Sequence, residues 1–189
     1  AVLMADADTG RVLFAEQEHR KVYPASLVTL RSGLLTFEAI EAGKTNLDEI
    51  VVTSTKASKI GGTQVFLKEG EEFTVRELLK AMIVRSANDA TLAMAEHVSG
   101  NEDSFVRLMN QRAKELGMAH TEFHSPHGLP PSRGEKHNVS TAYDLFLLAR
   151  FILHNHPQYL EWSAIEIDSF RAGTFQLVNT NRKLMRAYK

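Results

Sequence analysis

The fold is decided first by residues 24–40, whose sequence is PASLVTLRSGLLTFEAI. Apolar side chains recur there at spacings of three and four from Leu27 to Ile40, and Gly43 follows as a C-terminal cap would. The pattern predicts a buried helix that begins at Ser26. Serine is a preferred N-cap, so Ser26 taken alone is better explained as a cap than as a nucleophile. The first turn of a helix also favours a developing oxyanion, which keeps the second interpretation open.

The flanking sequence predicts a hairpin at each end of the chain and further helices between them. A capping box at Thr74 and Glu77 marks one helix start, and Pro157 is expected to stop the last helix. The predicted elements are a hairpin over 2–14, a loop-rich stretch over 48–73, helices over 74–85, 89–98, 102–116 and 140–154, a long loop over 124–137 and a hairpin over 165–178. The last segment, 179–189, shows no closing element.

Sheet at both ends with helices between predicts the α/β (α+β) class. At 189 residues and 21.1 kDa the chain suits one domain over 1–189. We expect two lobes, a sheet lobe formed by about 1–25 and 163–189 and a helical lobe formed by about 26–162. Two hairpins alone would leave sheet edges open, so we expect the natural protein to continue past Lys189.

The composition excludes several classes of protein. A net charge of −1 gives no basic surface for nucleic acid, and the absence of cysteine removes disulfides and thiolate chemistry. No apolar run approaches the roughly 20 residues of a membrane-spanning helix, and no signal peptide is visible at the N-terminus. Neutral or locally charged ligands fit this composition best.

Three further motifs hold polar groups at predicted helix boundaries or in loops. They are Ser86-Ala87-Asn88, His127-Gly128-Leu129, and His137 followed by 140–144. Taken singly, each is better explained as a helix boundary or as loop packing than as a functional site.

The order of these motifs resembles that of the serine D-alanyl-D-alanine carboxypeptidases, the low-molecular-mass penicillin-binding proteins. Their signature is S-x-x-K, S-x-N and K-T-G. The resemblance runs through nearly the whole chain, in the Asp8-Thr9-Gly10 turn, 24–26, 37–39, 61–63, 86–90, 126–129 and 140–142. It implies a two-lobed penicillin-binding fold, with an antiparallel sheet and flanking helices plus a helical lobe.

The resemblance also implies roles for particular residues. Ser26 matches the acylated nucleophile, and Ser86 and Asn88 match the second motif, which moves a proton and holds the substrate. Ser86 and Asn88, together with His127 and Gly128, are the implied substrate-binding residues.

The chain departs from the family at the position of the catalytic base. A serine hydroxyl is a weak nucleophile and needs a base one helical turn away, which the family supplies as lysine. Thr29 stands there, and 31–33 (Arg-Ser-Gly) replace residues that are usually apolar or threonine. No K-T-G segment occurs before Lys189. Lys56 and Lys59 are weak candidates for a substitute base, because surface lysines are normally solvated.

The histidines at 120, 124, 127 and 137 lie close in sequence, and three of them could bind zinc. Their spacing matches no H-x-x-x-H pair with a glutamate base, so loop packing is the better explanation. We expect no metal and no cofactor.

The leading hypothesis is a serine D,D-carboxypeptidase that removes the terminal D-alanine from peptidoglycan stem peptides through an acyl-enzyme on Ser26, impaired by Thr29. Its implied partners are stem peptides and β-lactams, which would trap the same serine. A non-catalytic peptidoglycan-binding or regulatory homologue is the alternative. A β-lactamase is disfavoured, since no dedicated deacylation base is evident. The resemblance implies a periplasmic or extracytoplasmic location, commonly with attachment to the membrane through a C-terminal amphipathic helix.

Overall fold

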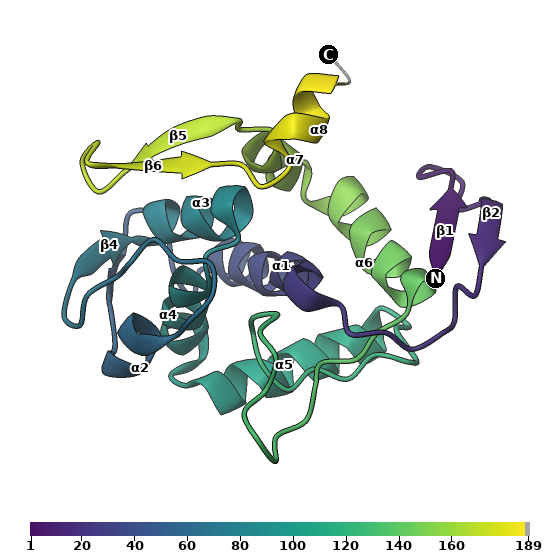
Figure 1. Ribbon diagram of the computed structural model, residues 1–189, viewed down its shortest axis with the longest axis horizontal. Helices are drawn as coiled ribbons and strands as arrows, with labels where there is room; N and C mark the ends of the chain where they lie inside the picture. The colour runs from purple at the N-terminus through teal and green to yellow at the C-terminus, as the bar shows by residue number, and fades with distance from the viewer. Residues whose placement is uncertain (188–189) are drawn as a thin grey trace.

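The computed structural model describes residues 1–187, which form a cluster of helices with short antiparallel strand pairs at its edges (Figure 1). The helices are the 3-10 turn η1 (Ala25–Leu27), α1 (Val28–Glu41), α2 (Thr55–Lys59), α3 (Val75–Arg85), α4 (Asn88–Ser99), α5 (Glu102–Glu115), α6 (Ala142–Asn155), α7 (Pro157–Ser163) and α8 (Arg182–Ala187). The strands are β1 (Val2–Ala5), β2 (Val12–Glu16), β3 (Ile50–Val52), β4 (Glu72–Thr74), β5 (Ile167–Phe170) and β6 (Phe175–Val178).

The core is built around α1, which contacts α3, α4, α5 and α6. Its buried apolar side chains, among them Leu34 and Phe37, pack in one cluster with those of the surrounding helices. Burying a side chain of this size contributes roughly 1.5–3 kcal/mol, so this cluster holds the helices around α1. The start of α1 is therefore a fixed point from which a side chain can be presented.

Local signals set the helix ends as the sequence predicts. Thr74 and Glu77 form the capping box at the start of α3. Asn101 and Thr141 cap α5 and α6 by accepting the backbone N–H groups of Ser104 and Asp144. The predicted helices over 74–85, 89–98, 102–116 and 140–154 are thus confirmed to within two residues at each end.

Three short helices were not predicted. The loop-rich stretch 48–73 contains α2, capped by Ser54, together with the antiparallel pair β3–β4. Pro157 does end α6, but it also occupies the first position of α7, where its missing N–H is harmless. The expectation that 179–189 has no closing element is wrong, because α8 lies there; residues 188–189 lie outside the described part.

Both terminal hairpins are confirmed, with Val2 paired to Glu16 in one and Ile167 paired to Val178 in the other. Within residues 1–187 they form separate two-stranded sheets, and in Figure 1 they lie on different sides of the helices. The division into a sheet lobe and a helical lobe stays a prediction. Among the described helices none has the length and apolar character needed to cross a membrane.

Candidate active site

Ser26 lies at the middle of η1, directly before α1, and is exposed. The preceding Ala25 has φ 49°, a left-handed conformation that is uncommon for a residue with a side chain and is enriched at functional sites. Neither η1 nor α1 has a side-chain N-cap, since their capping positions are Pro24 and Leu27. The interpretation of Ser26 as a cap is therefore wrong, and its hydroxyl group makes no hydrogen bond within residues 1–187.

Gly128 places the His127-Gly128-Leu129 segment directly on the backbone that carries Ser26. A Cβ at Gly128 would lie 2.0 Å from the carbonyl carbon and oxygen of Ala25 and 2.4 Å from the backbone nitrogen of Ser26. Contacts this short exclude any side chain. Glycine is required here by the approach of two backbones.

The loop that carries Gly128 is held from two sides. The Asn138 carboxamide accepts the backbone N–H groups of His124 and Ser125 and donates to the carbonyl oxygen of His127, at 2.8 Å. From α1, the buried Ser32 hydroxyl donates to the carbonyl oxygen of Pro126 at 2.6 Å. The loop and the start of α1 are thus fixed relative to each other.

Ser86 and Asn88 lie at the junction between α3 and α4. Ser86 is the C-cap of α3 with φ 58°, and its hydroxyl oxygen is buried without a partner in the described part of the chain. Asn88 donates its backbone N–H to the carbonyl oxygen of Thr63 and its side-chain Nδ2 to that of Gly61. Left-handed residues and buried unpaired hydroxyl groups are enriched at functional sites, so these features are compatible with a proton-transferring or substrate-binding role for Ser86.

Gly62 lies between the segment that carries Asn88 and the segment that carries Leu129. A Cβ there would lie 2.6 Å from Asn88 Nδ2 and 2.6 Å from Leu129 Cδ2. The contacts therefore run from Ser26 through Gly128 and Leu129 to Gly62 and Asn88. The structure brings together the segments that carry Ser26, Ser86, Asn88 and Gly128, which lie far apart in the sequence.

Asp89 is a supporting residue to which sequence reasoning gave no role. Its fully buried carboxylate accepts the backbone N–H groups of Val65 and Leu67, at 3.1 and 3.0 Å, and so fixes the loop that follows Gly62. The only signal was its place directly after Asn88 at the start of a helix, where acidic residues are common for other reasons.

Thr29 is buried, and its hydroxyl donates to the carbonyl oxygen of Ser26 at 2.7 Å. It closes the turn that carries the serine. A threonine hydroxyl is not a base at neutral pH, so the position one turn after Ser26 supplies structure but no proton acceptor.

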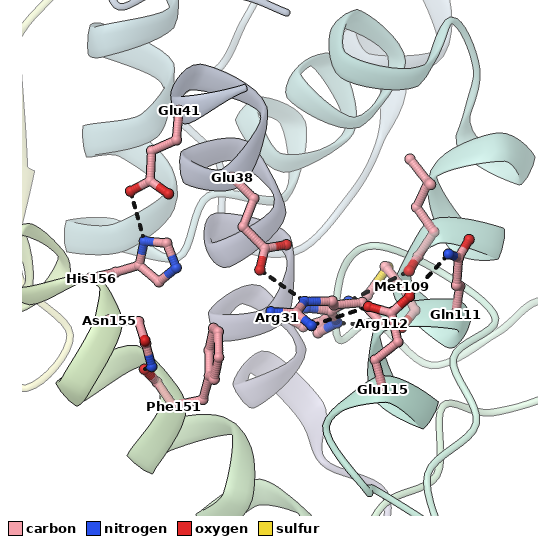
Figure 2. Close-up of polar contacts among 11 residues, drawn as sticks. Arg31, Glu38, Glu41, Met109, Gln111, Arg112, Glu115, Phe151, Asn155 and His156 are labelled. Carbon is pink, nitrogen blue, oxygen red and sulfur yellow. Dashed lines mark hydrogen bonds and ion pairs between the residues drawn. The ribbon is translucent and has the colours of Figure 1, made fainter. Parts of the chain in front are cut away.

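The next turn of α1 has partners of its own (Figure 2). Arg31 is fully buried, and its guanidinium donates to the carbonyl oxygen of Met109 on α5 at 3.3 Å, while Nη1 has no partner within residues 1–187. Burial lowers the pKa of Arg31 to about 10, and nearby Glu38 partly opposes this. Arg112 takes Glu38 as its ion-pair partner at 2.8 Å and stacks on Phe151.

Gly33 makes room for α7. A Cβ at this position would lie 2.7 Å from Cε2 and 2.9 Å from the hydroxyl oxygen of Tyr159, a residue that is 4% exposed. The helix penalty of about 1 kcal/mol for glycine is thus offset by the packing of an aromatic ring. Thr29, Arg31, Ser32 and Gly33 therefore each have a specific contact, although one guanidinium nitrogen of Arg31 is left unpaired within residues 1–187.

Neither lysine named as a substitute base has the properties of one. Lys56 Nζ lies 2.5 Å from a carboxylate oxygen of Glu102, and that hydrogen bond raises the pKa of Lys56. A base needs the opposite shift. Lys59 is exposed at the end of α2.

The histidines do not gather at one point. His124 faces Glu122, His127 faces Glu102 at 3.8 Å, and His137 stacks on Tyr23. Burial lowers the pKa of His127 and keeps its ring neutral at pH 7. Among residues 1–187 no group of three or more metal-binding side chains could hold an ion.

Comparison with known proteins agrees with this geometry. The model of the D-alanyl-D-alanine carboxypeptidase family matches residues 1–189. D-alanyl-D-alanine carboxypeptidase DacF of Bacillus subtilis is 40% identical over 185 residues, which are 96% of this chain and 46% of that protein. DacD of Escherichia coli is 36% identical over 163 residues, or 83% of this chain and 41% of that protein. The chain spans about half the length of the curated relatives it matches.

Solved structures give the same result. Penicillin binding protein 5 of Haemophilus influenzae is 28% identical with a TM-score of 0.90, covering 98% of this chain and 53% of that chain. Penicillin-binding protein D2 of Listeria monocytogenes, solved with ampicillin bound, is 29% identical with a TM-score of 0.84, covering 95% of this chain and 70% of that chain. The predicted α/β penicillin-binding fold is confirmed, and the chain belongs to the D-alanyl-D-alanine carboxypeptidase family.

Proposed function

We propose that this protein acts on the D-alanyl-D-alanine ends of peptidoglycan stem peptides through an acyl-enzyme on Ser26. The observation that carries the proposal is the contact of Gly128 with the backbone of Ala25 and Ser26. This contact places the His127-Gly128-Leu129 segment against the exposed serine. The resemblance to relatives named carboxypeptidases supplies the substrate class.

In the proposed reaction the Ser26 hydroxyl attacks the carbonyl carbon of the penultimate D-alanine. Its proton passes to the leaving nitrogen, the peptide bond breaks, and D-alanine departs. Water then cleaves the ester and restores the hydroxyl. Ser86, whose hydroxyl oxygen is buried and unpaired in the described chain, is suited to pass the proton. Asn88 and the backbone at His127 and Gly128 are suited to hold the peptide.

The absence of a lysine at position 29 determines how fast we expect Ser26 to be acylated. Losing a general base lowers the rate by about 10²–10⁴-fold. Thr29 is engaged with the Ser26 carbonyl, and Lys56 with Glu102. We therefore infer that Ser26 is acylated slowly, and that Lys56 does not replace the missing lysine as a general base.

A specific observation favours a second candidate, a homologue that binds peptidoglycan without turnover. Thr29, Arg31, Ser32 and Gly33 each make a specific contact, so the altered turn of α1 is an integral part of the fold. In that case the peptide would bind beside Ser26 and remain intact.

The test is release of D-alanine from N-acetylated peptides ending in D-alanyl-D-alanine, measured by chromatography. We expect slow or undetectable release by the protein, a gain of about 10²–10⁴-fold in Thr29→Lys, and none in Thr29→Lys combined with Ser26→Ala. Peptide binding without a gain in Thr29→Lys would favour the second candidate. Absence of both binding and release in every form would overturn the proposal.

Two further properties belong to the same proposal. β-Lactams should acylate Ser26, in line with the ampicillin-bound structure of the Listeria protein. Because its relatives are named D-alanyl-D-alanine carboxypeptidases and penicillin-binding proteins, and the proposed substrate is peptidoglycan, we also infer action outside the cytoplasmic membrane.

A further inference from the structure

The loop over 124–138 and the residues just after it contact the segment that carries Ser26 at two points. At one point Gly128 lies against the backbone of that segment. At the other, Val22 and Ser140 exchange backbone hydrogen bonds of 2.8 and 3.0 Å. Figure 1 shows the loop between the start of α1 and α5. How the loop is folded therefore determines where Gly128 lies relative to the serine.

The buried carboxamide of Asn138 folds this loop. Its oxygen accepts the backbone N–H groups of His124 and Ser125, at 2.6 and 3.0 Å. Its Nδ2 donates to the carbonyl oxygen of His127 at 2.8 Å and to Oγ of Ser125 at 3.0 Å. Asn138 is 8% exposed. One side chain thus fixes the residues that lead directly to Gly128.

The residue before Asn138 contacts the serine segment from the other side. His137 stacks on Tyr23, with ring centroids 4.2 Å apart. The contacts form a closed path from Tyr23 through His137 and Asn138 to Gly128, and from there back to the backbone at Ser26. Without the carboxamide, Gly128 would be free to shift against the nucleophile.

We propose that Asn138 is a positioning residue for the acylation of Ser26, which acts by holding Gly128 against the backbone of the nucleophile. The inference rests on the proposed function. Both polar atoms of the carboxamide are engaged within the loop, so Asn138 acts through the loop rather than by contact with the substrate. A misplacement of about 1 Å can lower a reaction rate by about 10²-fold. Binding, which is shared among several groups, should suffer less than the attack itself.

The test is labelling by a fluorescent penicillin in the Thr29→Lys protein, followed over a range of penicillin concentrations. This separates the rate constant of acylation from the apparent affinity. We expect Asn138→Ala to lower the rate constant by about 10–10²-fold and to change the affinity by less than about threefold.

Asn138→Asp is a second variant of nearly the same size. It keeps an oxygen that accepts the N–H groups of His124 and Ser125 but replaces the donor to the carbonyl oxygen of His127 by a second oxygen. We expect the rate constant to fall by at least about tenfold, because two oxygens would then face each other. If Asn138→Ala does not fold, Asn138→Asp decides.

Thr74 supplies a matched control, because its side chain also accepts a backbone N–H group, in the capping box at the start of α3. Ser86 lies at the opposite end of that helix. Thr74→Ala should lower stability but leave the rate constant of acylation within about threefold of that of Thr29→Lys. Urea denaturation measures the loss of stability in each variant.

Each outcome decides between the two proposals. A rate constant within about tenfold of that of Thr29→Lys, an equal loss in Thr74→Ala, or a loss confined to the affinity overturns the inference. The proposed function then stands, because Thr29→Lys is still labelled. If Thr29→Lys is not labelled at all, the proposed function falls and the inference with it.

Discussion

Two regions around Ser26 are built in different ways. The loops that surround it meet at glycines. A Cβ at Gly128 would overlap the backbone of Ala25 and Ser26, whereas a Cβ at Gly62 would meet the side chains of Asn88 and Leu129. The turn of α1 that follows it, from Thr29 to Gly33, is packed through side chains that hydrogen-bond to backbone carbonyl oxygens. A contact between backbones fixes a residue type absolutely, whereas a contact between side chains can be replaced by another of similar volume. The glycine contact at Gly128 should therefore tolerate substitution less well than the side-chain contacts of α1.

The strongest test of the comparison is Gly128→Ala. We expect a loss of about 3 kcal/mol in the free energy of unfolding, because the new methyl group would meet the backbone of Ala25 and Ser26. Urea denaturation measures it. The matched control is Gly61→Ala, where a Cβ meets nothing within 4 Å and the backbone is not left-handed. Equal effects in both variants would refute the claim that backbone contact fixes Gly128.

Arg31 tests the adaptable region. Arg31→Ala should lower the free energy of unfolding by about 2–3 kcal/mol, because it leaves a cavity between α1 and α5. Arg31→Met fills that space without a buried charge and should change stability by less than about 1 kcal/mol in either direction. Thermal and urea unfolding of both variants give the comparison. A methionine variant as unstable as the alanine variant would show that the guanidinium itself is required.

Gly33→Ala distinguishes helix propensity from packing. In an open helix this change stabilises by up to about 1 kcal/mol, but here we expect a net loss of about 1–2 kcal/mol because of the ring of Tyr159. Combining it with Tyr159→Leu removes the obstacle, so a double-mutant cycle should show favourable coupling. If the effects of Gly33→Ala and Tyr159→Leu on stability are additive, the ring of Tyr159 is not the cause of the loss in Gly33→Ala.

The smallest expected effect is the pH dependence at His127. Burial lowers the pKa of His127, with Glu102 opposing the shift and Lys56 supporting it. As pH falls below about 6.5 the unfolded chain takes up the proton first, so the stability that neutral His127 contributes above that pH is lost. The advantage of the native protein over His127→Gln should therefore shrink by less than about 1 kcal/mol between pH 7.5 and 5.5. If the stability advantage of the native protein over His127→Gln grows as the pH falls, the pKa of His127 is not lowered in the folded state.

The helices with strong periodicity and caps could be predicted, because a capping box such as that of Thr74 acts over four residues. The helices α2, α7 and α8 were missed because each has seven residues or fewer, too short to display a period. Pro157 illustrates the ambiguity, since the same residue ends one helix and starts another.

The candidate site could be predicted only as a set of motifs in order. Ser26 is not a helix cap because the chain enters the helix through the left-handed backbone of Ala25. The residue type of Ala25 does not predict that conformation. The roles of Asn138 and Asp89 depend on loops that return from 13 to 24 residues away, so local sequence gave no sign of them. The sequence showed glycine at positions 62 and 128, but it did not show which neighbouring atoms approach each glycine.

The central claim is that Ser26 is the acylated residue and that Thr29 limits its rate. Mass spectrometry of the protein after incubation with a penicillin tests this directly, since trypsin cuts after Lys21 and Arg31 and isolates the serine in peptide 22–31. We predict an adduct on this peptide that forms slowly and is absent in Ser26→Ala. In Thr29→Lys, where trypsin also cuts after residue 29, the adduct lies on peptide 22–29 and forms about 10²–10⁴-fold faster. An adduct on Ser86 or another residue, or none in Thr29→Lys, would contradict the account.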